Sequence, residues 1–567
     1  MEGRGLSGRT LRRDAQGDLR GDLRWPTIPA LWASAVERFG DGEALVDGHR
    51  RFTWNELNAK IAEAARAFVA LGIDPGDRVA IWVPNVWEWV VALVALQQVG
   101  AVLVPLNTRY KGSEAGFIVG RSRARLLLTV DGFLGNDYIT MLRDANGGSG
   151  EGAGQPNRPV ADLPSLEQVV VLRTDQAPAG TITWDEFLGC AGGASTADVT
   201  ARIKALDAGS VCDILFTSGT TGQPKGVVCS HGQSLRAVTT WADIVGLRAD
   251  DRYLIVNPFF HSFGYRAGIL ACLVTGAVMV PLAVFDVPAI VERVMTERIS
   301  MLPGAPSIYQ SMLNHPDREQ LAASSLRLAV TGAAAIPVSL VEEMRTGLGF
   351  ETVVTAYGLS EGTGFATMCR ADDDAETIAT TSGRAMPGID VKIVDDAGAP
   401  VDAGHPGEVV VRGYNVMRGY FEDPEQTRQT VDAGGWLHTG DIGVMDERGY
   451  VAITDRKKDM FIVGGFNAYP AEIEAALVRH PAVSQAAVVG VPDQRLGEVG
   501  VAYVIPARGE TVEPDELIAW ARDQMANYKV PRRVIPVDQL PLNAAGKVLK
   551  FELRQRAAVD QTDDQES

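Results

Sequence analysis

The chain has 567 residues, too many for one hydrophobic core, so we expect two or more domains. Its formal net charge of −18 argues against a general surface for nucleic acid or anionic membranes, so an anionic ligand needs a local cationic site or a metal ion. The five cysteines lack a CxxC pair or metal-ligand spacing, which predicts reduced thiols in a cytoplasmic protein.

Neither the N-terminus nor the most apolar stretch is expected to be a targeting or membrane segment. Residues 1–24 mix Arg with Asp and lack an apolar run, which predicts a disordered tail; a second one is expected at 559–567. The apolar stretch 86–105 is interrupted by Glu88 and by Gln and Gly residues. A transmembrane helix needs about 20 mostly apolar residues, so this stretch predicts a helix followed by a strand.

Short apolar runs alternate with helical segments through the first half of the chain. Runs rich in β-branched residues predict buried strands, and residues 87–99 predict a helix between the first two. The predicted strands are residues 79–84, 101–106, 126–130, 168–172, 253–256 and 277–280. Strand–helix–strand units with short connections indicate an α/β fold with a parallel sheet covered by helices. Residues 146–164, rich in Gly, Pro and Asn, predict a solvent loop.

A polyphosphate site is predicted by the string Phe216-Thr-Ser-Gly-Thr-Thr-Gly-Gln-Pro-Lys-Gly-Val227. Its hydroxyls, bare backbone N–H groups and single cation are the groups that cradle phosphates. The candidate ligands are Thr217, Ser218, Gly219, Thr220, Thr221, Gly222 and Lys225. The string is not a Walker A loop, because Pro224 separates Gly222 from Lys225. Taken singly, these residues would suit an ordinary surface loop.

Taken whole, the string resembles the phosphate-binding signature of the adenylate-forming enzymes, which include acyl-CoA synthetases, beetle luciferases and peptide-synthetase adenylation domains. The resemblance implies ATP and Mg²⁺ as ligands. It also implies a large α/β N-terminal domain of several subdomains, with mixed and parallel sheets flanked by helices, at about 25–457. A small, mobile α+β lid domain is expected at 458–558.

The segment Asn257-Pro-Phe-Phe-His-Ser-Phe-Gly264 carries a histidine among aromatic residues. A lone His in such a setting is usually a packed core residue. In the family, the corresponding segment lines the carboxylate pocket, which makes His261 a catalytic residue that positions the substrate carboxylate. Phe263 and Ala267 would then face the acyl pocket. The absence of an Asp beside His261 counts against an amino-acid substrate.

Two further strings match family motifs around the adenine. The first, Thr331 to Pro337, resembles a loop that edges the adenine and acyl sites and contains Gly332. The second, Tyr357-Gly-Leu-Ser-Glu-Gly-Thr-Gly364, combines an aromatic ring, a hydroxyl and a carboxylate, which suits base stacking, phosphate binding and a divalent cation. The resemblance assigns base stacking to Tyr357 with Gly358 and phosphate binding to Ser360. It makes Glu361 and Thr217 the metal ligands. Alone, the string would predict a turn with a buried Tyr.

The ribose and the lid account for the remaining motifs. Residues 435–441 predict a hairpin or turn, and the resemblance makes Asp441 the acceptor for the ribose hydroxyls, with Arg456 beside it. Lys458 would be the hinge of the lid. The bare glycines Gly464 and Gly465 would admit the thiol of CoA, and Lys547 would be the catalytic lysine. The lid itself is predicted from residues 470–479, 485–491, 500–505 and 516–525, which alternate helix and strand patterns.

Motifs in the family's order from Phe216 to Lys547 imply an AMP-forming acyl-CoA synthetase acting on a carboxylic acid, ATP and CoA. The strings 104–111 and 131–138 resemble the actinobacterial acyl-CoA ligases of steroid-ring breakdown (HIP-CoA ligases), which activate a propanoate on a methyl-hydrindanedione. Medium- or long-chain fatty acids and aryl acids remain alternative substrates. A luciferase-like oxygenase, a carrier-protein loader and a non-catalytic nucleotide-binding protein are competing classes.

Two further points stay open at this stage. Arg266 follows His261 closely, so its guanidinium could donate to a ring ketone; the alternative is that it faces an acidic neighbour or solvent. The expected partners are small molecules and not nucleic acid, and a homodimer is left open.

Overall fold

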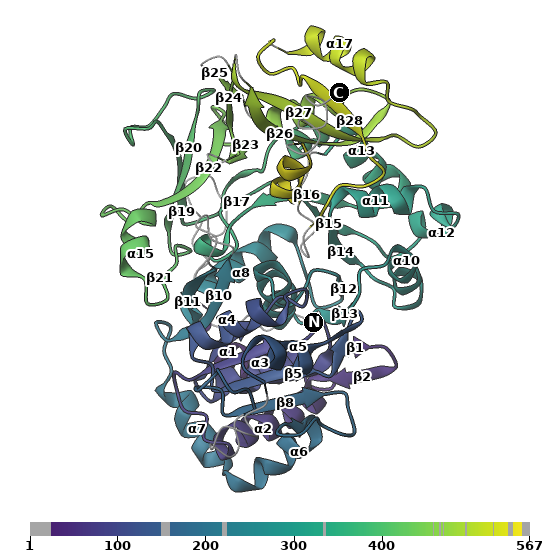
Figure 1. Ribbon diagram of the computed structural model, residues 1–567. Coiled ribbons are helices and arrows are strands. Elements are labelled where there is room, and N and C mark those ends of the chain that lie inside the picture. The colour runs from purple at the N-terminus through teal and green to yellow at the C-terminus, as the bar shows by residue number, and fades with distance from the viewer. Residues whose placement is uncertain are drawn as a thin grey trace.

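The computed structural model describes residues 24–148, 159–217, 224–332, 336–456, 459–463, 466–468, 470–493, 496–525, 527–542 and 548–557. The tail predicted at 559–567 lies outside these residues, as does the tail predicted at 1–24 except for its last residue. Residues 149–158 of the predicted solvent loop lie outside them too. The fold is α/β, with a large N-terminal part of mixed and parallel sheets and a small C-terminal part (Figure 1). No helix in the described ranges is long and apolar enough to cross a membrane.

The first large sheet carries the strands that lead into the phosphate string. Its order is β21 (Gly419–Tyr420), β11 (Lys225–Ser230), β10 (Val211–Thr217), β4 (Val102–Pro105), β3 (Arg78–Trp82), β5 (Leu126–Val130), β8 (Gln168–Leu172) and β9 (Ile182–Thr183). Strands β10 to β9 are parallel, and β11 and β21 are antiparallel. The buried, β-branched runs of the sequence therefore form a parallel sheet, as predicted.

The second large sheet brings together the loops of the other motifs. Its order is β18 (Arg384–Ala385), β17 (Thr367–Met368), β16 (Thr352–Tyr357), β15 (Leu328–Thr331), β14 (Met301–Gly304), β12 (Arg252–Ile255), β13 (Val278–Pro281), β1 (Glu43–Asp47) and β2 (Arg50–Thr53). The run from β16 to β1 is parallel. Loops that follow neighbouring parallel strands emerge at the same sheet edge.

The apolar stretch 86–105 forms the predicted helix and strand. Helix α3 (Trp87–Gln98) is buried at every residue and contacts both β4 and β1, so it lies between the two large sheets. Its one carboxylate, Glu88, accepts a hydrogen bond from Arg173 Nε at 3.0 Å. Burial raises the pKa of Glu88, and the charge of Arg173 opposes that shift. A helix that is buried on every side, with its charge paired, is therefore a core element here.

The other helices cover the sheets. They are α1 (Ile28–Phe39), α2 (Trp54–Ala70), α4 (Gly112–Ser122), α5 (Tyr138–Ala145), α6 (Trp184–Gly189), α7 (Thr196–Ala205), α8 (His231–Val245), α9 (Ala271–Thr275), α10 (Val287–Thr296), α11 (Pro306–Leu313), α12 (Arg318–Ala322), α13 (Val338–Gly347), α14 (Ala375–Thr380) and α15 (Pro424–Thr430). A π-helix, η2 (Phe263–Leu270), precedes α9, and a short 3₁₀ turn, η3 (Ser360–Gly362), follows β16.

A third, antiparallel sheet consists of β19 (Ile389–Val394), β20 (Pro406–Gly413), β22 (Leu437–Met445) and β23 (Val451–Arg456). The prediction of a hairpin or turn at 435–441 holds only at its start, where Gly435 and Trp436 belong to a turn closed by the bridge between Val431 and Leu437; the rest of the segment is strand β22. The backbone carbonyl of Asp432 accepts the N–H of Gly435, and the N–H of Asp432 donates to the carbonyl of Trp436. The chain has therefore already reversed when β22 begins. Asp441 therefore lies within a strand.

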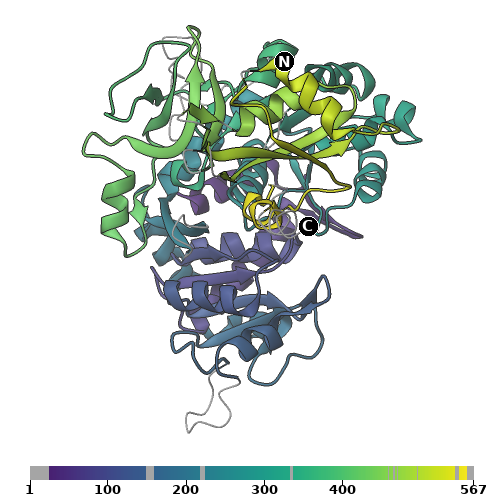
Figure 2. The same cartoon turned by 45° about the horizontal axis from the view of Figure 1, so that its top comes forward.

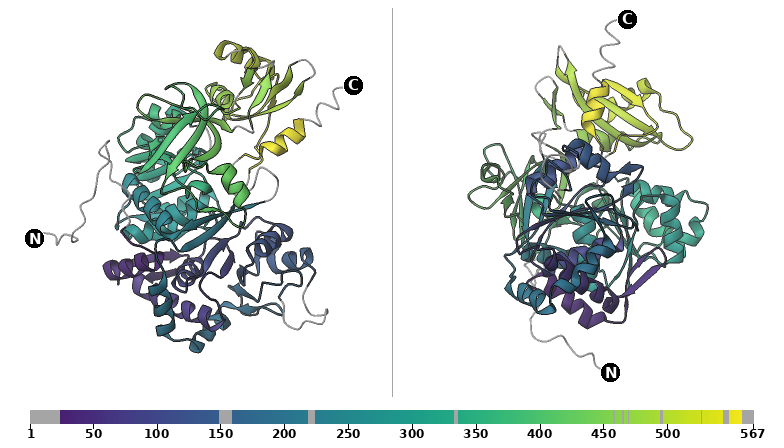
Figure 3. Two further views of the ribbon diagram at one scale, coloured as in Figure 1. Left: turned by 90° about the vertical axis from the view of Figure 1, so that its left-hand side faces the viewer. Right: turned by 60° about the horizontal axis from the view of Figure 1, so that its bottom comes forward.

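The C-terminal part has its own sheet: β25 (Phe466–Ala468), β24 (Phe461–Val463), β27 (Gly497–Pro506) and β26 (Val483–Asp493), with β28 (Arg533–Pro536) also on β27. Helices α16 (Pro470–Leu477) and α17 (Pro514–Gln524) match the predicted ones. The buried apolar clusters here are distinct from the main core of the preceding residues. These elements gather at one end of the molecule, opposite α2 and α6 (Figures 1 and 3).

Candidate active site

Three of the predicted motifs follow neighbouring parallel strands of the second sheet. His261 lies in the loop after β12, Gly332 directly follows β15, and Tyr357 ends β16. The order β16–β15–β14–β12 places these segments along one edge. Turning the molecule brings the third sheet and the C-terminal part forward above this region (Figure 2). Ligands of open α/β sheets bind at such carboxyl ends of the strands.

Two residues of the predicted phosphate-binding string, 216–227, form the last pair of the β10–β11 hairpin before its loop, a position called the mouth of the hairpin below. Thr217 ends β10 and is the register partner of Lys225, which begins β11. The Lys225 ammonium lies 5.4 Å from the ring centroid of Tyr420 and donates to Gln426 Oε1. Ser218, Gly219, Thr220, Thr221 and Gly222 lie outside the described residues, so their predicted role stays a prediction.

Glu361 lies close to this mouth. Its Oε1 is 3.4 Å from Thr217 Oγ1 and accepts a hydrogen bond from the Tyr420 hydroxyl at 3.0 Å. A carboxylate beside a hydroxyl offers the oxygen ligands that Mg²⁺ prefers. No cluster of three or more His, Cys, Asp or Glu side chains that could hold a metal occurs in the described parts of the chain. The assignment of Glu361 and Thr217 as metal ligands stays a prediction.

Tyr420 is a residue of the candidate site that the sequence did not predict. It belongs to β21, which pairs with β11, and the backbone N–H of Met417 donates to the carbonyl of Glu361 at 2.8 Å. The segment around Tyr420 thus contacts both the β10–β11 hairpin and Glu361. A Gly–Tyr pair before a short helix carries no chemical signal of its own, so only the strand pairing identifies Tyr420.

Tyr357 and Asp441 meet across two sheets. The Tyr357 hydroxyl donates to Asp441 Oδ2 at 2.5 Å, and Asp441 is 5% exposed. In the β22–β23 ladder, Asp441 is the register partner of Arg456, so the two predicted ribose contacts are adjacent in the backbone. At Gly358, a Cβ atom would lie 2.1 Å from the carbonyl oxygen of Gly364, so a side chain is excluded there.

His261 is an accessible histidine held in one orientation. Its Nδ1 accepts the backbone N–H of Phe263 at 3.2 Å, which leaves the proton of a neutral ring on Nε2. The residue keeps solvent-accessible surface, but the dense protein around its ring disfavours the charged form and lowers its pKa to about 4, with a further contribution from the charge of Arg266. His261 is therefore neutral near pH 7 and can donate from Nε2.

The two predicted acyl-pocket residues differ in accessibility. Phe263 begins η2, is partly exposed and meets Trp241 edge-on at 6.0 Å between ring centroids. Ala267 is 0% exposed on the same π-helix. Its assignment to the acyl pocket stays a prediction, and in this structure its methyl group has no accessible surface.

The hypothesis that Arg266 donates to a substrate ketone is wrong. Arg266 is 0% exposed, and its Nη2 donates to Asp213 Oδ1 and Oδ2 at 2.8 and 2.9 Å. The acidic neighbour, the alternative left open above, is a residue of β10. A guanidinium without accessible surface cannot reach a ligand, so Arg266 has a structural or positioning role.

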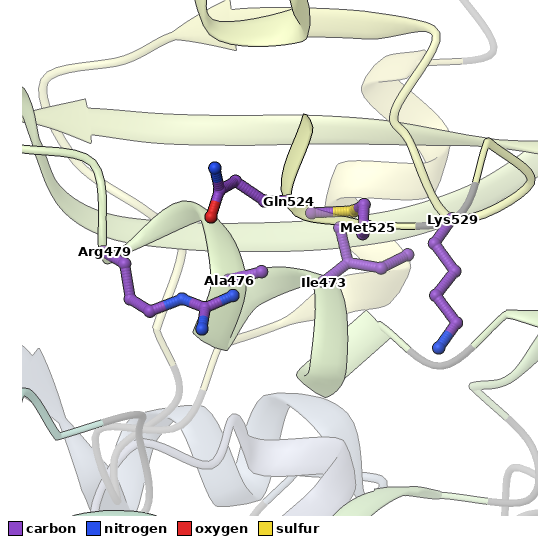
Figure 4. Close-up of a pocket in the computed structure, with 6 residues that line it drawn as sticks. All are labelled: Ile473, Ala476, Arg479, Gln524, Met525 and Lys529. Atoms are coloured by element: carbon purple, nitrogen blue, oxygen red, sulfur yellow. The ribbon is translucent and has the colours of Figure 1, made fainter. Parts of the chain in front are cut away.

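The predicted lid residues Lys458, Gly464, Gly465 and Lys547 lie outside the described residues. In the described part of this region, a cavity of about 80 Å³ is lined by Ile473, Ala476, Arg479, Gln524, Met525 and Lys529 (Figure 4). Sites for drug-sized ligands usually occupy about 300 Å³ or more, so this cavity is too small to hold a nucleotide or CoA.

The nucleotide motifs and the fold agree with comparisons to known proteins. The model of the family "AMP-binding enzyme" matches residues 32–421, and that of the "AMP-binding enzyme C-terminal domain" matches residues 472–547. Among solved structures, the anthranilate CoA ligase AuaEII in complex with anthranoyl-AMP has a TM-score of 0.82 and 26% identity, covering 95% of this chain and 99% of that one.

Two curated relatives share a name, 3-[(3aS,4S,7aS)-7a-methyl-1,5-dioxo-octahydro-1H-inden-4-yl]propanoyl:CoA ligase. The one from Rhodococcus jostii (strain RHA1) is 47% identical, covering 93% of this chain and 98% of the relative. The one from Mycobacterium tuberculosis (strain ATCC 25618 / H37Rv) is 50% identical, covering 94% and 99%. With the family model spanning most of the chain, these matches show that the protein belongs to the AMP-binding enzyme family.

Proposed function

We propose that this protein is an AMP-forming acyl-CoA synthetase whose substrate is a propanoate borne on a methyl-hydrindanedione ring system. The observation that carries the proposal is the identity of 47% and 50% to two ligases named for this acid, over nearly their whole length. In the first step, a carboxylate oxygen attacks the α-phosphorus of ATP and pyrophosphate leaves. In the second, the thiol of CoA attacks the acyl carbonyl and AMP leaves.

The described residues divide into groups for phosphate, ribose and acid. Thr217 and Glu361 would hold Mg²⁺, which would supply positive charge to offset the charge on the phosphate oxygens. Lys225 would add a cation at the mouth of the hairpin. Asp441, buried and within reach of the Tyr357 hydroxyl, would accept the ribose hydroxyls, while the Tyr357 ring stacks on the adenine.

His261 would hold the carboxylate of the acid. Because its pKa is lowered to about 4, the ring is neutral at pH 7, and its Nε2–H would donate to one carboxylate oxygen. A neutral donor orients the carboxylate without the strong charge pairing that would lower its nucleophilicity. Such orientation is a large part of what an enzyme contributes to a reaction between two bound substrates.

The lid would alternate between two poses. The N-terminal domain would comprise about residues 25–457 and the lid 458–558; the separate apolar clusters on either side support this division. Lys547 would serve the first step, and rotation about Lys458 would bring Gly464 and Gly465 to the CoA thiol. A lid exchange of this kind can limit turnover. A cytoplasmic location stays a prediction, and a homodimer stays open.

A panel of acids tests the proposal. Purified enzyme, ATP, Mg²⁺ and CoA are incubated with the steroid-derived propanoate, with octanoate or with a cinnamate, and AMP and thioester are quantified. We expect the highest kcat/KM for the steroid-derived acid. Equal or higher kcat/KM for octanoate would discard the substrate and keep the ligase activity. Absence of acid-dependent AMP with every acid would contradict the ligase activity itself.

A further inference from the structure

Arg266 and Asp213 form an ion pair with no solvent access. Both side chains are 0% exposed, and Nη2 of Arg266 contacts both carboxylate oxygens of Asp213, at 2.8 and 2.9 Å. Burial raises the pKa of the Asp213 carboxyl, and the charge of Arg266 opposes that shift. Replacing such a buried pair with apolar residues of similar volume is often neutral or stabilising, so fold stability alone does not account for it.

The same guanidinium binds two hydroxyls on different elements. Its Nη1 donates to Ser262 Oγ at 2.8 Å, and its Nε donates to Ser234 Oγ at 3.2 Å. Ser234 belongs to α8 and Asp213 to β10, whereas Ser262 lies between His261 and Phe263. Arg266 therefore connects the segment assigned to the acid with two elements of the scaffold.

Ser262 has little room to move. A Cβ atom at Gly364 would lie 2.3 Å from Ser262 Oγ, so the motif that carries Glu361 passes directly against it. A Cβ atom at Gly264 would lie 2.1 Å from the carbonyl oxygen of Pro258, so the loop is wound tightly before η2 begins. The helix η2 is itself a π-helix, a rare form that is frequent at functional sites.

Strand β10, which carries Asp213, depends less on the ion pair for its position than the loop that carries His261. Strand β10 is paired with β4 on one side and with β11 on the other, so Asp213 is fixed without Arg266. The backbone bonds of His261 are local: its N–H donates to Pro258 O and its carbonyl accepts from Tyr265, both at 3.0 Å. Asn85 holds the start of the loop, because its side chain accepts the N–H of Phe259 at 2.7 Å and donates to the carbonyl of Asn257 at 2.9 Å. Loss of the pair should therefore release the end of the loop, residues 260–264, and leave the strand in place.

We propose that the Asp213–Arg266 pair, acting through Ser262, positions His261 and Phe263 for the acid and so controls the use of the acid more than the use of ATP. The kinetic test of this inference rests on the proposed function, whereas the hydrogen-exchange test below does not. Arg266 and Asp213 are positioning residues, because neither touches a ligand.

The decisive variant removes both charges together, Asp213→Val with Arg266→Met, so that no unpaired charge stays buried. We expect kcat/KM for the acid to fall at least 10-fold and KM for ATP to change less than 3-fold. Ser262→Ala, which keeps the ion pair, should lower kcat/KM for the acid in the same direction by a smaller factor. Arg266→Lys, which keeps the charge, should retain more activity than the double variant.

A matched control removes the ion pair between Asp251 and Arg327, whose side chains are 2% and 13% exposed. Asp251→Val with Arg327→Met should leave the ratio of the two KM values unchanged. A double variant of Asp213 and Arg266 with wild-type kinetics would overturn the proposal. Equal loss of acid and ATP use would overturn it too, because the pair would then act on the whole site.

Hydrogen exchange gives a test that does not depend on the activity. In the double variant of Asp213 and Arg266, amide exchange should increase at least 10-fold in residues 260–264 and stay near the wild-type rate in residues 211–217. Unchanged exchange in residues 260–264 would overturn the positioning role whatever the substrate is. Wild-type enzyme without acid-dependent AMP, but with this exchange pattern, would instead contradict the proposed function and leave the positioning role standing.

Discussion

Tyr420 and Glu361 are joined by a hydrogen bond of 3.0 Å between the phenolic hydroxyl and Oε1. The ring of the same tyrosine lies 5.4 Å from the Lys225 ammonium. One side chain thus contacts both the carboxylate predicted to hold Mg²⁺ and the cation predicted to meet the phosphates. Burial raises the pKa of Tyr420, and the negative charge of Glu361 adds to the shift, so the hydroxyl keeps its proton and donates.

Tyr420→Phe removes this hydrogen bond and keeps the ring beside Lys225. A hydrogen bond to a charged group contributes about 1.5 to 3 kcal/mol, so we expect the Kd of Mg·ATP to rise about 10-fold or more by titration calorimetry. ATP without Mg²⁺ should bind with nearly unchanged affinity. Tyr414→Phe is the matched control, because the Tyr414 hydroxyl contacts only Thr240 among the described partners, at 3.4 Å. Equal losses with and without Mg²⁺ would contradict the role of Tyr420.

Asp441→Asn tests the ribose assignment. The amide keeps the shape of the side chain but loses the charge, so it is a weaker acceptor for the two ribose hydroxyls. We expect KM for ATP to rise at least 10-fold, with little change in KM for the acid. Asp390→Asn in the same sheet is the control, since Asp390 is exposed and pairs only with Arg412 among the described contacts. Similar kinetics in the two variants would remove Asp441 from the nucleotide site.

The stability of the protein should fall in mild acid because of His231. This buried residue, 1% exposed, accepts the N–H of Ile28 on Nδ1 at 3.2 Å, and burial lowers its pKa to about 4. The unfolded chain binds the proton at higher pH than the folded one, near 6.5. Stability is therefore fully present above about 6.5 and is lost as the pH falls towards 4, by roughly 3 kcal/mol.

The variant His231→Asn keeps an acceptor for Ile28 and removes the titration. Thermal unfolding at pH 7.0, 5.5 and 4.5 should show a smaller fall in Tm for this variant than for the wild type. His405→Asn, at an exposed histidine, should follow the wild type. An identical acid dependence in the wild type and His231→Asn would show that another group carries the effect.

Lys547→Ala should separate the two half-reactions. A cation on a transferring phosphoryl group contributes about 3 kcal/mol or more in the transition state, so formation of the acyl-adenylate should slow at least about 100-fold. Thioester formation from supplied acyl-adenylate should be nearly unchanged. Lys550→Ala is the control, since Lys550 pairs with Glu474 at 2.8 Å within the C-terminal part. Equal loss of both half-reactions would contradict the exchange of lid poses.

Much of the fold could be predicted because the strands are short, apolar and regularly spaced. The predicted strands 126–130 and 168–172 coincide with β5 and β8. The buried helix α3 could be distinguished from a membrane span by Glu88, whose charge requires a partner such as Arg173. The hairpin or turn predicted over 435–441 extends only to Trp436, and Asp441 lies further along strand β22.

The candidate site was less predictable, because its members meet through tertiary pairing. Tyr357 and Asp441 are separated by 84 positions, and Tyr420 and Glu361 by 59. The sequence leaves open whether Arg266 faces the substrate or an acidic neighbour, because proximity to His261 in the sequence does not determine which way a side chain points. On the π-helix η2, Arg266 points into the core toward Asp213, a partner that no local pattern identifies.

The central claim is that a carboxylate oxygen of the acid attacks the α-phosphorus of ATP. The most direct measurement uses the steroid-derived propanoate labelled with ¹⁸O in its carboxylate, followed by mass spectrometry of the nucleotide and phosphate products. The mechanism predicts that AMP carries one ¹⁸O atom from the acid and that pyrophosphate carries none. Formation of ADP with ¹⁸O in inorganic phosphate would contradict it, because the acid would then have attacked the γ-phosphorus.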